Sequence, residues 1–111
     1  LERRGITDPT RTEIIRGSGV EMDQYPVTPL PLQPPFICAY AGRMIRMKGL
    51  DDLYAAFEII RSNGRSDIHL WLCGLPDPGN PQSWDEGRLR TWEKHNPAIT
   101  WKGHQSMRDI W

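Results

Sequence analysis

Apolar and polar positions follow a regular pattern from residue 36 onward. Three short runs are mostly apolar, which is typical of strands buried on both faces of a parallel sheet. These runs lie at 36–41, 68–73 and 98–101. Between them, apolar residues recur at helical spacing, which predicts two amphipathic helices. The helices are expected at 50–62 and 84–95.

The two predicted helices carry recognisable signals. The apolar face of the first is formed by Leu50, Leu53, Phe57 and Ile60. The second is predicted to begin with a capping box over 83–86, in which Ser83 and Glu86 satisfy each other's backbone N–H groups. Ser106 and Asp109 have the same spacing, which indicates one more helix start close to the end of the sequence.

This alternation of elements predicts an α/β fold. The order strand, helix, strand, helix, strand implies right-handed crossovers and a Rossmann-like parallel sheet. The strand at 36–41 is expected to lie beside the strand at 68–73. The sequence stops at Trp111, one turn into the next predicted helix, so we interpret the chain as a piece of a longer protein. Half a sheet leaves an unpaired edge, and we expect the isolated chain to be marginally stable and prone to associate.

The first 35 residues have a different character. They hold six of the ten prolines, mostly within 25–35, where proline excludes both a helix interior and a central strand. This stretch is predicted to be an extended linker, and residues 12–16 ahead of it to form one short strand. We therefore expect the tail of a preceding domain with its linker at 1–35, and a truncated Rossmann-like domain at 36–111.

Composition excludes several classes of protein. Fourteen Lys and Arg balance fourteen Asp and Glu, so the zero net charge argues against a general nucleic-acid binder. No apolar run approaches the ~18 residues that indicate a transmembrane segment. Cys38 and Cys73 lie in apolar runs and are predicted to be buried, unreactive thiols. The three histidines share no finger-like spacing with the cysteines, so no metal site is expected.

Candidate chemistry concentrates in the loop from Gly42 to Gly49. The loop follows a predicted strand, and ligands of open α/β sheets bind at the carboxyl ends of strands. It also opens a predicted helix, whose N-terminal N–H groups attract anions, and Arg43 and Lys48 add two positive charges there. A phosphate or diphosphate is the ligand that suits this loop. The alternative stays open that these are solvated basic side chains on an ordinary loop.

Other motifs give weaker signals. Met47-Lys48-Gly49 lacks the Ser or Thr of a Walker A loop, and Met22 stands where a dinucleotide fingerprint beginning at Gly17 needs its third glycine. Neither an ATPase nor an NAD enzyme is therefore supported. The five tryptophans are predicted to serve core packing rather than carbohydrate stacking, and Asp77 to belong to a turn.

Several short motifs also occur in a definite order along the chain. Gly19-Val20 precedes the proline-rich linker, Gly42-Arg43 ends the first predicted strand, and Lys48-Gly49 opens the first predicted helix. Further pieces lie at 55–57, 70–74, 77–81 and 99–104. This ordered set resembles the retaining glycosyltransferases of the GT-B fold, above all the large bacterial group that builds capsular polysaccharide, lipopolysaccharide and other surface glycans. The resemblance is strongest over residues 36–104.

The resemblance implies a specific site. Members of that family have two Rossmann-like domains facing a cleft, and the C-terminal domain binds the nucleotide sugar. The chain would then hold the hinge and the first half of that nucleotide-sugar-binding domain. Arg43 and Lys48 would stabilise the leaving diphosphate as the catalytic cations. Gly42, Gly103 and His104 would complete the nucleotide site, with the nucleotide-diphosphate sugar as donor substrate and without a metal or other cofactor.

The resemblance also implies a reaction and a place in the cell. A sugar would pass to a glycan or lipid-linked acceptor, which an N-terminal domain absent from this chain would bind. The parent enzyme would work in the cytoplasm, with peripheral association at the inner face of the membrane as an alternative place. The family's Glu-x7-Glu motif would follow Trp111, so we expect this piece alone to be inactive.

The chain departs from the family pattern at two positions. Glu21 stands where relatives often have Asp, and Leu75 follows Gly74 where they often have Asp. A functional alternative from a different class is a non-catalytic Rossmann-like module that binds phosphate or a partner protein.

Overall fold

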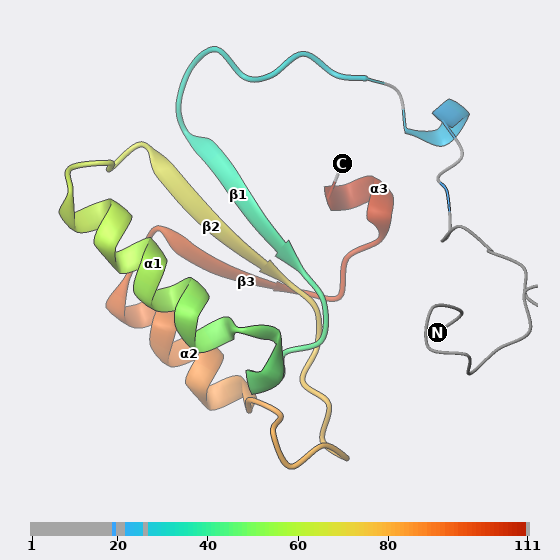
Figure 1. Ribbon diagram of the computed structural model, residues 1–111, viewed down its shortest axis with the longest axis vertical. Helices are drawn as coiled ribbons and strands as arrows, with labels where there is room; N and C mark the ends of the chain where they lie inside the picture. Colours follow the sequence, from blue (N-terminus) through green and yellow to red (C-terminus); the bar gives the residue numbers. More distant parts are fainter. Residues whose placement is uncertain (1–18, 20–21, 26, 111) are drawn as a thin grey trace, which may run out of the picture.

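A computed structural model describes residue 19, residues 22–25 and residues 27–110 of the chain (Figure 1). The strands are β1 (Phe36–Ala41), β2 (Ile68–Cys73) and β3 (Ile99–Gly103). The α-helices are α1 (Leu50–Ser62), α2 (Glu86–His95) and α3 (Met107–Ile110), and the short 3-10 helices are η3 (Met22–Gln24) and η4 (Arg46–Lys48). The strand expected at 12–16 lies outside the described residues.

The three strands form one parallel sheet in the order β1-β2-β3. Phe36 pairs with Ile68, and Leu70 pairs with Ile99. The register between β2 and β3 shifts after Leu72, so that Cys73 pairs with Gly103. The predicted α/β, Rossmann-like arrangement with adjacent first and second strands is confirmed. Because the sheet is parallel, the carboxyl ends of all three strands lie at the same end of the sheet.

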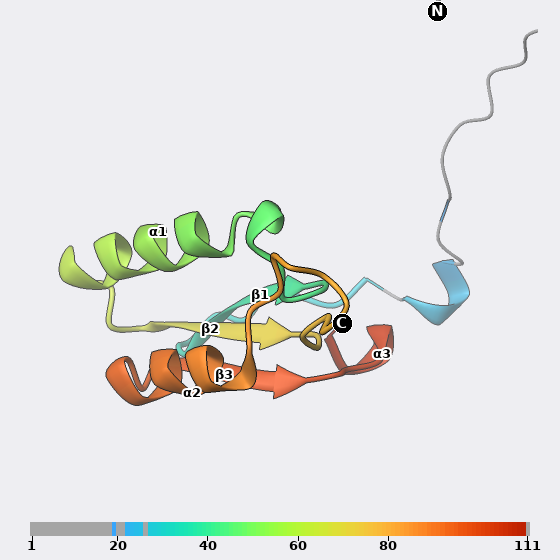
Figure 2. The ribbon, with the colours of Figure 1, turned by 90° about the horizontal axis from the view of Figure 1, so that it is seen from below.

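Helices α1 and α2 pack side by side against one face of the sheet (Figure 1, Figure 2). The Tyr54 ring of α1 stacks on Trp92 of α2 with 4.2 Å between centroids, and Trp84 meets Trp92 edge-on at 4.3 Å. The core lies between these helices and the sheet. Its buried members are Met44, Leu50, Phe57, Leu70, Leu72, Trp84, Leu89, Trp92, Ala98, Ile99 and Trp101. The prediction that tryptophans serve core packing is confirmed for Trp84, Trp92 and Trp101.

The first strand differs from its prediction. β1 is not buried on both faces, since the Ile37 side chain is 40% exposed and Cys38 is exposed. The prediction of a buried Cys38 is therefore wrong, whereas Cys73 is buried as expected. Both helices pack on one face of the sheet, and Ile37, which alternates along β1 with the core-packed Tyr40, lies on the other face. Ile60 is likewise 39% exposed, so the buried face of α1 is narrower than its periodicity predicts.

The residues ahead of β1 show no regular structure from 27 to 35. Their large apolar side chains face solvent, with Val27 86%, Leu30 84% and Leu32 89% exposed. The absence of helix and strand agrees with the proline content, and the role of this segment as a linker between domains stays a prediction.

The cap of α2 also differs from its prediction. The helix begins at Glu86, and the Asp85 carboxylate accepts a hydrogen bond of 2.8 Å from the Arg88 N–H. Ser83, the predicted cap, instead accepts a bond from the Asp77 N–H with its hydroxyl. The predicted helix start at Ser106 is confirmed, because its hydroxyl and the Asp109 carboxylate bond to each other's backbone N–H groups at 3.3 and 3.1 Å.

Asp85→Ala is expected to lower the free energy of unfolding by about 1 kcal/mol, because the first turn of α2 loses its side-chain cap. Urea unfolding followed by circular dichroism measures this. Glu86→Ala is the control, since Glu86 is exposed and caps nothing in the structure. A larger loss for Glu86→Ala than for Asp85→Ala would show that the predicted capping box is the true one.

Candidate functional site

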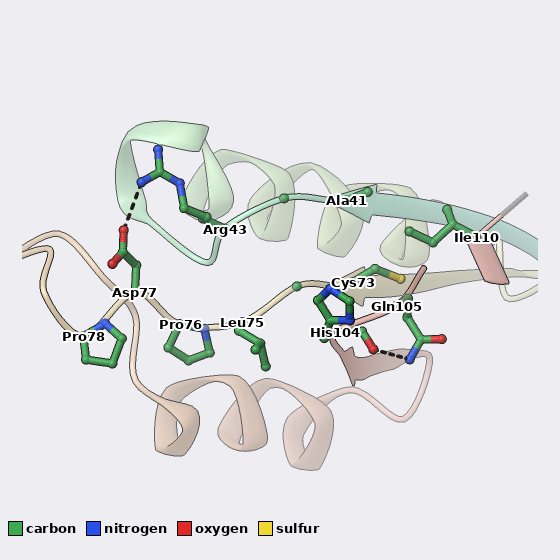
Figure 3. Close-up of a pocket in the computed structure, with 12 residues that line it drawn as sticks. Ala41, Arg43, Cys73, Leu75, Pro76, Asp77, Pro78, His104, Gln105 and Ile110 are labelled. Atoms are coloured by element: carbon green, nitrogen blue, oxygen red, sulfur yellow. Dashed lines mark hydrogen bonds and ion pairs between the residues drawn. The ribbon is translucent and has the colours of Figure 1, made fainter. Parts of the chain in front are cut away.

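A cavity of about 710 Å³ lies at the carboxyl edge of the sheet (Figure 3). All three strand ends contribute to it. The lining residues are Ala41, the last residue of β1, with Gly42 and Arg43 after it, Cys73, the last residue of β2, with residues 74–78 after it, and His104, Gln105 and Ile110 after β3. Ligands of open α/β sheets bind at the carboxyl ends of the strands, because the loops that follow the strands converge there.

Gly74 allows the strand ends to meet closely. Its φ of +148° lies in the region that favours glycine, and an added Cβ would overlap the carbonyl oxygen of Gly42. The Gly42 N–H donates to the Cys73 carbonyl at 2.9 Å, and the Gly74 N–H donates to the Gly103 carbonyl at 2.6 Å. The floor of the cavity is thus built from backbone held in close contact.

The loop that carries Arg43 is fixed against the loop after β2. The Met44 N–H donates to the Leu75 carbonyl at 3.0 Å, and the Trp84 N–H donates to the Met44 carbonyl at 2.8 Å. The Met44 side chain is fully buried in the core. The backbone on the C-terminal side of Arg43 is therefore anchored, and its freedom lies in its side chain.

Arg43 pairs with a residue that the sequence did not connect with it. Its Nη1 lies 3.0 Å from Oδ2 of Asp77, and the two side chains are 63% and 31% exposed. The expected turn at Asp77 is present, since the Asn80 N–H donates to its carbonyl at 2.8 Å. Asp77 therefore forms a turn and also presents its carboxylate to the cavity.

The predicted site residues divide into two groups. Gly42, Arg43 and His104 line the cavity. Gly103, the last residue of β3, has φ +68° and is not a lining residue. Lys48 is exposed at the end of η4 and is not a lining residue.

The third basic residue of the loop turns away from the cavity. Arg46 places its Nε 3.4 Å from Oδ2 of Asp51, at the start of α1. Arg88 approaches the other oxygen of the same carboxylate at 2.6 Å. The loop therefore brings one of its three basic side chains to the cavity, where sequence reasoning expected two.

Sequence reasoning missed several lining residues. Cys73 lines the cavity, and burial raises the pKa of its thiol, which the charge of Lys102 lowers to a smaller extent. Gln105 uses its amide nitrogen locally, donating to the carbonyl oxygens of Lys102 and His104 at 3.0 and 2.9 Å. Ile110, on α3, adds an apolar side chain to the lining of the cavity. These residues lie close together because the strands pair in a parallel register, which the sequence alone does not reveal.

Within residues 22–25 and 27–110, no three His, Cys, Asp or Glu side chains gather closely enough to hold a metal ion. No helix of the described part is long and apolar enough to cross a membrane. The chain matches no protein-family model, no curated protein and no solved structure. The resemblance to glycosyltransferases thus stays a prediction.

Proposed function

We propose that this cavity binds the diphosphate of a nucleotide sugar, and that the chain is part of a retaining GT-B glycosyltransferase. The sugar would pass to a glycan or lipid-linked acceptor in the synthesis of surface polysaccharide, in the cytoplasm or at the inner face of the membrane. One observation carries the proposal. Arg43 stands on anchored backbone at the end of β1, and it lines a cavity formed by all three strand ends.

The dimensions and lining of the cavity suit such a ligand. Small-molecule sites commonly have about 300–1,000 Å³ and combine an apolar wall with a few polar groups. Here Ala41, Leu75, Pro76 and Ile110 supply apolar surface, and Arg43 supplies a charged fork of N–H donors. A guanidinium can bond two oxygens of a phosphate at once, which a neutral donor cannot match.

The chemistry of the proposed reaction needs a positive charge at this place. When a nucleoside diphosphate leaves the sugar, negative charge builds on its terminal phosphate. A positive group held near that phosphate stabilises the transition state more than the ground state and thereby accelerates departure. In this proposal Arg43 makes the direct contact, and Lys48, outside the cavity, contributes through its longer-range field.

Ligand binding to the chain tests the proposal. We expect uridine, guanosine or adenosine diphosphate to bind more tightly than its own nucleoside in isothermal titration calorimetry. Arg43→Ala should weaken diphosphate binding about tenfold, which corresponds to about 1.4 kcal/mol for a lost charge-assisted contact. Nucleoside binding should change little.

Arg46→Ala is the matched control, because Arg46 belongs to the same loop and pairs with Asp51 outside the cavity. It removes the same charge at a similar exposure and should leave diphosphate binding nearly unchanged. Equal losses in the two variants would show that only net charge matters and would contradict the assignment of Arg43.

A further inference from the structure

We propose that Asp77 is an internal competitor for Arg43. The Asp77 carboxylate pairs with the Arg43 guanidinium while the cavity is empty. An anionic ligand binds by replacing that carboxylate as the partner of Arg43. This inference rests on the proposed function and deepens it, because it assigns to Asp77 the control of affinity and selectivity for anions at that site.

The contact between the two residues is real but weak. It consists of one hydrogen bond, from Nη1 of Arg43 to Oδ2 of Asp77 at 3.0 Å. Both side chains line the cavity, and Figure 3 shows them reaching toward each other at one end of it. With 63% and 31% exposure, the pair is screened by water, and such pairs are readily broken. A phosphate that offers two oxygens to the same guanidinium can replace it.

The structure also shows that the backbone is anchored on both sides of the pair. The backbone of Asp77 is held without help from Arg43, because its N–H donates to the Ser83 hydroxyl at 2.8 Å and its carbonyl accepts the turn bond from Asn80. The backbone of Arg43 is held as well, since its carbonyl accepts a 2.9 Å bond from the Tyr40 hydroxyl. The exchange therefore needs only side-chain rotation without backbone movement, and such rotation occurs on a fast timescale.

The pair has a consequence for charge. Among the Arg, Lys, Asp and Glu side chains, those that line the cavity are Arg43 and Asp77, and their charges cancel. An empty cavity thus attracts anions less than Arg43 alone would. A ligand must offer Arg43 more than one carboxylate oxygen does, and this requirement favours a diphosphate over a neutral nucleoside.

Binding of inorganic pyrophosphate to the chain tests this inference without reference to any base. We expect Asp77→Asn and Asp77→Ser to bind pyrophosphate about two- to fivefold more tightly than the wild-type chain, the equivalent of losing one exposed ion pair. Two variants are used so that a folding defect in one does not decide the result, and circular dichroism checks both. In an Arg43→Ala background, Asp77→Asn should produce no tightening.

Asp67→Asn is the matched control. Asp67 forms a comparable exposed pair with Arg65 at 2.9 Å, with side chains 31% and 55% exposed, and it precedes β2 at the opposite edge of the sheet. If Asp67→Asn tightens pyrophosphate binding by a similar factor, the effect of Asp77→Asn comes from net charge, and the inference is overturned. A second outcome overturns the inference and leaves the proposed function standing. In that outcome both Asp77 variants bind pyrophosphate no more tightly than the wild-type chain, while Arg43→Ala still weakens pyrophosphate binding. If Arg43→Ala leaves wild-type binding unchanged, the proposed function fails, and the inference fails with it.

Discussion

We expect Gly74→Ala to lower the free energy of unfolding by about 3 kcal/mol or more, the upper part of the range for single substitutions. The new methyl group would meet the carbonyl oxygen of Gly42, which belongs to the backbone and cannot rotate away. The residue would also have to keep a φ of +148°, which L side chains rarely adopt. Relief requires β1 and β2 to separate at the floor of the cavity.

Urea unfolding followed by tryptophan fluorescence measures this loss. Gly79→Ala is the control, because Gly79 lies in the same loop and a Cβ there meets nothing within 4 Å. That variant should stay within about 0.5 kcal/mol of the wild type. If the two alanine variants unfold alike, the close approach of Gly42 and Gly74 is not a feature of the folded chain.

The second large effect concerns catalysis in the intact glycosyltransferase that we propose. Arg43→Ala is expected to lower turnover about 10²–10³-fold, because losing a charged donor to the leaving group costs about 2.7–4 kcal/mol of transition-state stabilisation. Lys48→Ala should lower turnover less, since Lys48 lies outside the cavity. Turnover with the nucleotide-sugar donor is the measurement, with circular dichroism to confirm that each variant is folded.

Arg46→Ala serves as the control for this experiment too. Its pairing with Asp51 places it away from the cavity, so near-normal turnover is expected. Near-normal turnover of Arg43→Ala together with a strong loss in Arg46→Ala would show that the loop has been assigned the wrong way round. The resemblance by itself predicts strong effects for both Arg43 and Lys48, so the order of these two variants separates the geometric assignment from the family pattern.

Local features were predictable because their causes are local. The apolar runs of β1 and β2 and the helical spacing of α1 depend on residues within a few positions of one another, and their predicted bounds match the structure. The cap of α2 shows where this fails. Ser83 has the right spacing for a cap, but the turn at Asp77 takes its hydroxyl, and Asp85 becomes the cap instead.

Burial was predictable only in part, because it depends on what lies beyond the strand. Cys38 and Cys73 occupy similar apolar runs, yet the first is exposed and the second buried. The difference arises from tertiary packing, because Cys73 ends β2 where the loops after all three strands converge, whereas Cys38 lies in the middle of β1, away from those loops. No property of the residues around Cys38 contains that information.

By itself, the sequence determined the kind of fold, the bounds of β1 and β2 and the position of Arg43 just after the first strand, since periodicity and strand ends are read along the chain. The third strand was predicted at 98–101 and lies at Ile99–Gly103. Only the tertiary structure decided which side chains share the cavity. Arg43 and Asp77 are 34 positions apart, and they meet because β1 and β2 pair in parallel and bring their following loops to one edge. Lys48, five positions from Arg43, is excluded from the same cavity. Proximity in the site follows from strand register and loop direction, and neither is a property of sequence spacing.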